Sequence, residues 1–366
     1  MIRYFILLAG IFFIVSCKQN KTKQNMDNVL EINIESKNVL NNVKYLDLIT
    51  DLKYVPLETT SDCLIGHLDK VEISDDGIFA LDSRIAKVVY RFSKDGKFIN
   101  QIGQRGEGPG EYFQPDDMSI DPNTGDIAIL DQMKVLIYKP DNTYLRNIKL
   151  PDYAYKIGWY DNRFVTFNRG DDELILLDEK EGKHIGAFFQ SLPDEKRMVL
   201  EYPFQRYENK EFLYFTNLDY TIYRISEENV LPHVRFVFDQ RMFTDKDIKS
   251  LQSSSIDDFV WIIYYSENPS HIYMIYKYKQ VPYMVIYDKL NIKTKLIDLR
   301  EIQNDVTFMR EPPLIMGVDS NGYFVAGFEF SEVSDPNELK KKIDCSTENL
   351  DLMSNPILLY FKFKEL

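Results

Sequence analysis

The sequence is poor in the residue patterns that usually reveal a chemical function. Of its 366 residues, three are cysteine and two are tryptophan. The four histidines lie far apart, without the HxH or HExxH spacing of a local metal site: His67, His184, His233 and His271. A GxSxG motif is also missing, and neither Cys63 nor Cys345 has a local signature of a catalytic cysteine. The sequence therefore identifies no catalytic residue, metal ligand or cofactor.

Positive charge is scarce as well. The chain has 44 Lys and Arg residues against 57 Asp and Glu residues, which leaves a net charge of −13 at pH 7. Nucleic-acid binding depends on neutralising phosphates with Lys and Arg side chains, so an acidic chain is a poor candidate for it. We therefore expect no nucleic-acid partner.

Only the N-terminus has a long apolar run, from Tyr4 to Val15 after the cationic start Met1-Ile2-Arg3. This run is too short to span a bilayer comfortably and has the length of a signal-peptide core. Its end, Ile14-Val15-Ser16-Cys17, resembles the bacterial lipobox. The resemblance implies that residues 1–16 are removed and that Cys17 is lipidated, which anchors the protein stably to a membrane. An ordinary signal peptide with an incidental cysteine, or a short membrane anchor, is the alternative.

Residues 17–45 are predicted to be the lipidated cysteine and a flexible tether. The stretch 18–28 is polar and cannot bury enough apolar surface to fold. Lipoproteins displayed on the cell surface often carry acidic residues directly after the cysteine, whereas here Lys18, Lys21 and Lys23 come first. This favours the periplasm-facing leaflet of the outer membrane, with surface exposure as the alternative.

From Leu64 onward the chain is a series of short alternating or apolar runs separated by turn residues, and it contains 24 Tyr and 24 Phe. This pattern is typical of β-strands. Helical signals are confined to 335–343, where a capping residue is followed by Pro and Glu, and to 244–251. We therefore expect an all-β fold.

The strands form an internal repeat. The two clearest copies are 77–102 and 125–148, in which Asp82 and Asp131 end equivalent strands 49 residues apart. We expect these two carboxylates to accept backbone N–H bonds. Four weaker strand pairs follow: 163–178, 212–225, 272–288 and 323–361. The chain thus holds six units of roughly 40 to 55 residues, a period typical of β-propellers.

We accordingly predict a six-bladed β-propeller of four-stranded antiparallel blades over residues 46–366, with five or seven blades, or two β-sandwiches, as alternatives. The ring is expected to close by pairing 52–57 with 357–363, which removes free sheet edges. This closure would bring Cys63 towards Cys345. A disulfide between them is one expectation for an oxidising compartment, and two separate buried thiols are the other.

The junction between the first two units is rich in glycine and reads Ile102-Gly103-Gln104-Arg105-Gly106-Glu107-Gly108-Pro109-Gly110-Glu111-Tyr112. It resembles the NHL-repeat junction. Together with the lipobox and Tyr54-Val55-Pro56-Leu57-Glu58, it resembles the six-bladed β-propeller lipoproteins of gut-type anaerobic bacteria. The resemblance extends from about Asp47 to the C-terminus, is specific only in the first two units, and implies no settled activity.

In related propellers this junction lies near one mouth of the central channel. The resemblance therefore makes four of its residues candidate ligand contacts: Arg105, Glu107, Glu111 and Tyr112. An inter-blade salt bridge is the alternative role. A phosphate-binding role is not expected, because no helix follows the glycines.

Three functional hypotheses follow. The first is an envelope-anchored, non-catalytic binding or scaffold propeller for a protein, peptide or glycan. The second is a metal-dependent hydrolase, lactonase or lyase, with a divalent cation held in the central channel by residues from different blades. The third is a structural or sensory partner in a nutrient-uptake system. Trp159 and Trp261 could stack on sugars, although core packing is the simpler role for them.

Overall fold

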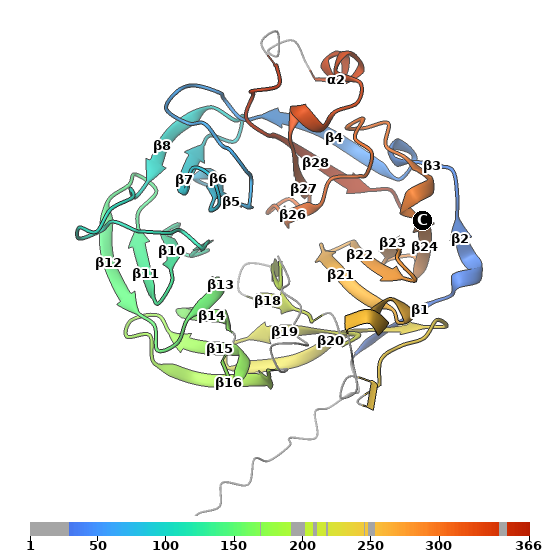
Figure 1. Cartoon of the computed structure of the whole chain (residues 1–366), viewed down its shortest axis with the longest axis horizontal. Coiled ribbons are helices and arrows are strands. Elements are labelled where there is room, and N and C mark those ends of the chain that lie inside the picture. Colours follow the sequence, from blue (N-terminus) through green and yellow to red (C-terminus); the bar gives the residue numbers. More distant parts are fainter. Residues whose placement is uncertain are drawn as a thin grey trace, which may run out of the picture.

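The repeated strand pairs form the middle strands of six β-sheets that are arranged in a ring (Figure 1). The computed structural model describes residues 29–168, 170–191, 202–207, 211–216, 219–244, 246–247, 253–343 and 350–366. The protein is a six-bladed β-propeller with four-stranded, mostly antiparallel blades, as predicted.

Each of the first three blades is a simple meander whose first strand lies nearest the centre (Figure 1). Blade 1 comprises β5 (Lys70–Ser74), β6 (Gly77–Asp82), β7 (Val88–Phe92) and β8 (Phe98–Ile102). Blade 2 comprises β9 (Asp117–Ile120), β10 (Ile127–Asp131), β11 (Lys134–Tyr138) and β12 (Tyr144–Lys149). Blade 3 comprises β13 (Ala154–Tyr160), β14 (Arg163–Asn168), β15 (Asp172–Asp178) and β16 (His184–Gln190).

The remaining blades follow the same order along the chain, except that the last one borrows a strand. Blade 4 comprises β17 (Phe204–Tyr207), β18 (Glu211–Tyr214), β19 (Thr221–Ser226) and β20 (Asn229–Phe238). Blade 5 comprises β21 (Trp261–Glu267), β22 (His271–Tyr278), β23 (Val281–Asp288) and β24 (Lys293–Asp298). Blade 6 comprises β26 (Ile315–Val318), β27 (Phe324–Phe328), β28 (Ile357–Phe363) and β4 (Ile49–Pro56).

The ring closes through the borrowed strand. β4 pairs antiparallel with β28, so that Tyr54 lies opposite Leu359 and Thr50 lies opposite Lys362. Leu57 extends the closure by donating its N–H to the carbonyl of Pro356 at 3.1 Å. This confirms the predicted closure, in which an N-terminal strand completes the last blade.

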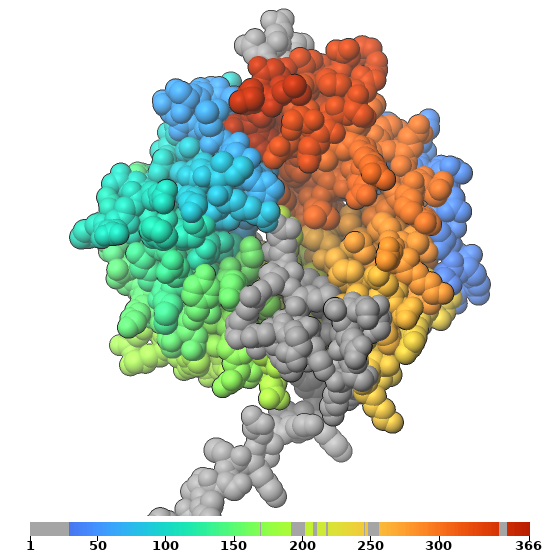
Figure 2. All heavy atoms as spheres, in the orientation of Figure 1, coloured from blue at the N-terminus to red at the C-terminus, as the bar shows by residue number. Residues whose placement is uncertain are grey.

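The N-terminal residues differ from the predicted tether from Leu30 onward. β1 (Leu30–Ile34) pairs parallel with β20, β2 (Val39–Leu40) pairs with β24, and β3 (Val43–Lys44) pairs with β25 (Ile302–Gln303). We call residues 30–44 the strap. Figure 2 shows its blue atoms along the outside of the orange part of the ring.

The strap can pair with the ring because buried apolar and exposed polar residues alternate along its first strand, as in any half-buried strand. Ile32 and Ile34 are both buried in a hydrophobic cluster that contains Phe236 and Phe238 of blade 4, while the intervening Asn33 is exposed. The predicted boundary at residue 46 therefore lies too late in the chain. Residues 17–28, which include Cys17, lie outside the described residues.

Helical structure is minor. α2 (Pro336–Lys342) occupies the predicted segment, and the side chain of Asp335 caps it by accepting the N–H of Glu338. Of the other predicted segment, residues 246–247 are helical, and 245 and 248–251 lie outside the described residues. The short 3-10 helices are η1 (Ser36–Asn38), η2 (Tyr45–Asp47), η4 (Ser253–Asp258), η5 (Leu299–Glu301) and η6 (Phe330–Glu332).

Asp82 and Asp131 hold the segments that lead into the inner strands. One carboxylate oxygen of Asp82 accepts the N–H groups of Gly66 and His67, and Asp131 accepts the N–H of Phe113 at 2.9 Å. Both side chains are buried, which is tolerable because each is saturated with hydrogen bonds. The prediction that they accept backbone N–H bonds is confirmed.

The two ends of the inner strands define two faces of the ring. On the hairpin face, short turns such as 75–76 and 319–323 join the first and second strands of each blade. On the opposite, crossing face, longer segments such as 103–116 enter the inner strands.

Candidate ligand-binding hollow

Two adjoining pockets open on the hairpin face. The channel lobe, of about 570 Å³, lies at the mouth of the central channel, and the interblade lobe, of about 770 Å³, lies between blades 5 and 6. The lobes share Asn268, Pro269, Ser320 and Gly322, so they adjoin, and we call the two together the hollow. The volume of each lobe is within the range of small-molecule sites.

Side chains of the inner strands tie neighbouring blades together below the channel lobe. In β5, Lys70 donates to the carbonyl of Met118 at 2.6 Å, and Glu72 accepts the N–H of Ile120 at 3.0 Å. In β9, Asp117 and Ser119 accept two N–H groups of β13 at 2.8 and 2.9 Å. Alternate residues of one inner strand thus bond the backbone of the next, which the period of two along a strand makes possible.

The charges in this layer are neutralised by one another. The Lys70 ammonium lies 3.1 Å from Asp117 and 3.4 Å from Glu72. Burial alone would lower the pKa of Lys70, but the two carboxylates outweigh it and raise that pKa above its ordinary value. Arg206 of β17 reaches the same layer, where it donates to the carbonyl of Ile120 at 2.6 Å and lies 3.4 Å from Glu72. This layer therefore joins the blades.

A buried carboxylate, Glu267, occupies the wall of the channel lobe at the end of β21. It accepts hydrogen bonds from the Tyr265 hydroxyl, the Lys289 ammonium and His233 Nε2, the last at 3.0 Å. Burial by itself would raise the pKa of Glu267, but His233 and Lys289 hold it below its ordinary value. Glu267 is therefore ionised at neutral pH and is not a proton donor.

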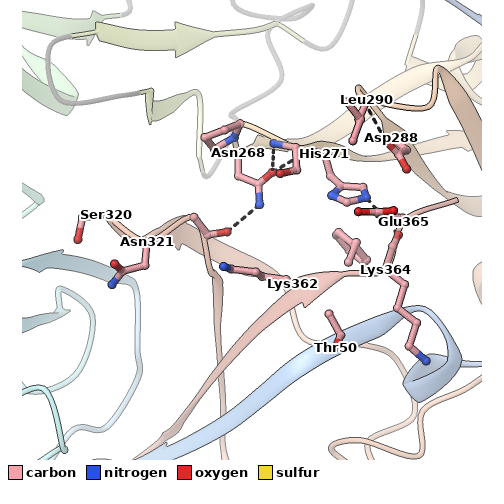
Figure 3. A pocket seen from close by; sticks show the side chains of 14 residues that line it. Thr50, Asn268, His271, Asp288, Leu290, Ser320, Asn321, Lys362, Lys364 and Glu365 are labelled. Atoms are coloured by element: carbon pink, nitrogen blue, oxygen red, sulfur yellow. Dashed lines mark hydrogen bonds between the residues drawn. The ribbon is translucent and has the colours of Figure 1, made fainter.

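Asn268 fixes the wall that the two lobes share (Figure 3). Its side-chain oxygen accepts the N–H groups of Ser270 and His271 at 2.9 and 2.7 Å, and its side-chain nitrogen donates to the Gly322 carbonyl at 2.7 Å. The last bond joins a turn of blade 5 to a turn of blade 6. Because Asn268 is buried and fully bonded, this wall is rigid.

Two further buried groups hold the far end of the interblade lobe. Asp288 accepts the N–H groups of Leu290, Asn291 and Leu366, and these bonds, which outweigh burial, hold its pKa well below its ordinary value. His271 donates from Nε2 to the carbonyl of Lys364 at 3.1 Å, and burial lowers its pKa, so the ring is neutral. Both groups connect blade 5 to the C-terminal residues.

Several polar side chains facing the interblade lobe remain uncommitted. In the described part of the chain, the side chains of Thr50, Ser270, Ser320 and Asn321 make no hydrogen bond to protein. Lys362 Nζ lies 4.5 Å above the ring of Tyr323 and has no carboxylate within ion-pair distance among those residues. Figure 3 shows Lys362 directed into the lobe and Lys364 directed away from it.

The lip of this lobe is apolar. Leu290 and Ile292, on the turn between β23 and β24, are 76% and 75% exposed, and Leu290 lines the lobe. Ile292 has a φ of 53°, in the left-handed region that β-branched residues rarely adopt. Two apolar side chains are therefore presented to solvent beside uncommitted polar groups.

A family model described as "Domain of unknown function (DUF4934)" matches residues 29–362, which is nearly the whole chain. The protein belongs to the DUF4934 family. The match begins at the residue before the strap, so the strap lies within the DUF4934 domain. No curated protein sequence matches the chain.

Of three similar solved structures, the first shows the same fold. A Bacteroides fragilis protein described as exported has a TM-score of 0.74 and 21% identity, covering 92% of this chain and 100% of its own. A Bacteroides caccae protein of unknown function has a TM-score of 0.40 and 12% identity, covering 64% and 82%. Virginiamycin B lyase from Staphylococcus aureus, with quinupristin, has a TM-score of 0.43 and 12% identity, covering 83% and 82%. At these identities the likeness concerns the fold alone.

The glycine-rich junction of this DUF4934 chain lies away from the hollow. Gly103 donates to the side chain of Asn142 at 2.6 Å, and Gly110 accepts the hydroxyl of Tyr138 at 2.8 Å, so the loop packs on the outer strands of blade 2. None of the four predicted contacts lines either lobe: Arg105, Glu107, Glu111 and Tyr112. The structure thus places them together and outside both lobes, and their role as ligand contacts stays a prediction.

The side chains of this loop that make contacts do so within the loop or with the strand that precedes it. Glu111 accepts the N–H of Gly108 at 2.7 Å and the side-chain amide of Gln104 at 2.6 Å, and these bonds lower its pKa. Tyr112 is buried and donates to the carbonyl of Ile102, while Arg105 lies over a neighbouring ring. In the described residues none of them forms an inter-blade salt bridge either.

Trp159, Trp261 and Cys63 do not line the hollow. Trp159 is buried and donates to Glu179 at 2.8 Å, and Trp261 is half-buried in blade 5. Cys63 is a buried free thiol that donates to the carbonyl of Glu58 at 3.1 Å. Cys345 lies outside the described residues, so its pairing with Cys63 stays a prediction.

The predicted channel cation also stays a prediction. Across the described ranges, no three His, Cys, Asp or Glu side chains come together in a way that could hold a metal ion. No helix in those ranges is long and apolar enough to cross a membrane.

Sequence reasoning missed the residues that line the interblade lobe. Thr50, Asn268, Asn321 and Lys362 are separated by up to 312 positions and come from three different parts of the chain. The only local signals are the turn motifs Asn268-Pro269-Ser270 and Asp319-Ser320-Asn321-Gly322, which predict turns but no site.

Proposed function

We propose that this protein is an envelope-anchored lipoprotein whose propeller binds a ligand in the hollow on the hairpin face, without catalysing its conversion. The observation that carries the proposal is the set of uncommitted polar side chains around the interblade lobe, held on walls that buried Asn268 and Asp288 make rigid. A rigid site whose donors and acceptors are unpaired loses little conformational freedom when it binds.

Binding is favoured over catalysis because the buried titratable groups in the hollow are already engaged. Glu267 is saturated by three donors, Asp288 accepts several N–H groups, and His271 donates to a backbone carbonyl. A general acid or base needs a free position aimed at the substrate. These groups instead hold the walls.

The envelope location rests on the lipobox that ends at Cys17 and on the fold shared with a Bacteroides fragilis protein described as exported. In this proposal, residues 17–28 tether the ring to the membrane. Because the strap begins at Leu30, the tether is shorter than the sequence predicts.

Thermal-shift screening of the purified full-length protein, with a library of oligosaccharides and peptides, tests the binding function. A ligand at a hundred times its Kd stabilises the folded state by about 2.7 kcal/mol, which raises the Tm measurably. Ser320→Trp fills the part shared by both lobes and is expected to abolish that rise. Glu181→Trp, on an exposed turn of blade 3, is the matched control and should keep it. A rise that survives Ser320→Trp, or no rise with any compound, would contradict the proposal.

A further inference from the structure

We propose that the interblade lobe binds an acidic oligosaccharide, with the carboxylate of a uronic-acid-type sugar at Lys362 and the sugar hydroxyls at the surrounding neutral side chains. This inference rests on the proposed binding function and names the ligand class of the same hollow. It is carried by three features: the charge of the lobe, its neutral groups and its lip.

The charge of the lobe favours an anionic group at one point. Lys362 Nζ faces the lobe without a carboxylate partner in the described residues, and its stem lies on the Tyr323 ring. The lining holds two acids: Asp288 accepts several N–H groups and is turned to the backbone, and Glu365 forms no ion pair with Lys362 within the described residues. His271 is neutral, and Lys364 donates to the Leu46 carbonyl at 3.1 Å, away from the lobe.

The adjoining channel lobe has the opposite character. Its lining contains six carboxylates and one guanidinium: Glu72, Asp75, Asp76, Asp121, Glu267, Asp319 and Arg206. Glu72 and Glu267 are paired with cations, which leaves the four aspartates as the excess of negative charge. A cleft with an excess of one sign repels ligand groups of that sign. An anionic ligand is therefore excluded from the channel lobe and retained beside Lys362, and any neutral remainder of the chain can extend across the shared wall.

The neutral groups match hydroxyls. Thr50, Ser270 and Ser320 each offer a donor and acceptor capacity, and Asn321 offers both in one amide. Sugar hydroxyls likewise donate and accept, so in each hydrogen bond between protein and sugar either partner can be the donor. An apolar ligand would leave these protein groups without water or a partner, which is costly.

The lip supplies the remaining contact. Leu290 is exposed at the edge of the lobe, and the turn that carries it is held by Asp288 through the N–H groups of Leu290 and Asn291. A sugar ring has one face covered by carbon-bound hydrogens, which packs on an apolar side chain. A fixed apolar lip beside hydroxyl and amide groups therefore suits a pyranose ring better than a fully polar ion.

Isothermal titration calorimetry with tetragalacturonate, neutral tetragalactose and cationic tetraglucosamine tests the inference on the full-length protein. Tetragalacturonate is expected to bind at least about tenfold more tightly than the neutral compound, because a hydrogen bond between two charged groups is stronger than one between neutral groups. Tetraglucosamine is expected to bind more weakly still. Equal affinity for the acidic and neutral compounds would overturn the role of Lys362.

Two lysines of the same C-terminal segment make a matched pair of variants. Lys362→Ala is expected to weaken tetragalacturonate binding at least about tenfold, Lys362→Arg to restore most of it, and Lys364→Ala to leave it unchanged. All three should keep the Tm of the parent protein closely, because neither lysine has an ion-pair partner among the described residues and the bond from Lys364 to the Leu46 carbonyl is exposed to solvent. Equal losses in Lys362→Ala and Lys364→Ala would overturn the inference.

The outcomes also separate the inference from the proposed function. If no oligosaccharide binds but a peptide raises the Tm of the parent protein and not of Ser320→Trp, the saccharide class is wrong and the binding hollow stands. If no compound of either kind binds, both proposals fail.

Discussion

Truncating one buried isoleucine of the strap to alanine tests whether residues 30–34 are part of the folded ring. Ile32 and Ile34 are each only 2% exposed and pack in a cluster with Phe236 and Phe238. Truncating a buried isoleucine to alanine costs about 2–5 kcal/mol, because apolar contact is lost and a cavity remains. At roughly 2–3 °C per kcal/mol for a domain of this size, Ile32→Ala and Ile34→Ala should each lower the Tm by about 4–15 °C.

The control lies on the same strand. Asn33 is exposed between the two isoleucines, so Asn33→Ala should change the free energy of unfolding by no more than about 0.5 kcal/mol. Differential scanning calorimetry compares the Tm values, and amide hydrogen exchange at residues 30–34 reports whether the strap opens locally. If the isoleucine variants match Asn33→Ala in both measurements, the strap contributes nothing to stability and the reasoning is wrong.

Four further changes have definite expected outcomes. Glu267→Gln removes a buried carboxylate that accepts hydrogen bonds from Lys289, His233 and Tyr265, and it should cost about 3–5 kcal/mol by chemical denaturation; a loss below about 1 kcal/mol would contradict the buried cluster. Burial lowers the pKa of His271, so the folded protein binds that proton more weakly than the unfolded chain, and stability is lost as pH falls from about 6.5 towards the folded-state pKa. In His271→Gln the urea midpoint should fall less between about pH 7 and about pH 5 than it does in the parent protein. An equal fall of the midpoint in both proteins would refute this prediction. Gly77→Ala forces a φ of +131° on alanine and brings its Cβ within 2.2 Å of a β7 carbonyl oxygen. The Tm should therefore fall by an amount equivalent to at least about 1–3 kcal/mol. The control is Gly317→Ala, whose Cβ would meet nothing closer than 3.8 Å and which should cost less. Cys17→Ala should abolish metabolic labelling with palmitate and move the protein out of the membrane fraction; unchanged labelling would contradict the lipobox.

The ring itself could be predicted because its signals are periodic. Strands such as 77–82 and 127–131 are apolar runs bounded by turn residues, and they recur at one spacing. The closure followed from the same logic, since a ring without a partner for 357–363 would leave an apolar edge. These features depend on local alternation and on composition, which are visible in one sequence.

The strap was missed because its alternation covers a single short strand. Leu30–Ile34 reads apolar, acidic, apolar, polar, apolar, and it directly follows a polar stretch, so the tether was extended too far. Five residues of alternation are weak evidence in isolation. They become a strand only because β20 presents a free edge 200 positions later.

The hollow could not be predicted for a different reason. Its polar groups come from residues as far apart as Thr50 and Lys362, which only the cross-strand register brings opposite one another. The glycine-rich junction drew attention by its composition, but positive φ at Gly103 and Gly110 lets that chain turn outward against blade 2. The composition of the junction indicated only a turn, whereas the residues of the hollow come together through the pairing of distant strands.

The pairing of the strap has a consequence for the order in which the chain can fold during its synthesis. Residues 30–44 are made before their partners in β20, β24 and β25, which follow roughly 200 to 260 positions later. Such distant contacts are slow to form, because a long loop must close before any contact compensates for its entropy. The strap must therefore stay unpaired until blades 4 and 5 have been synthesised.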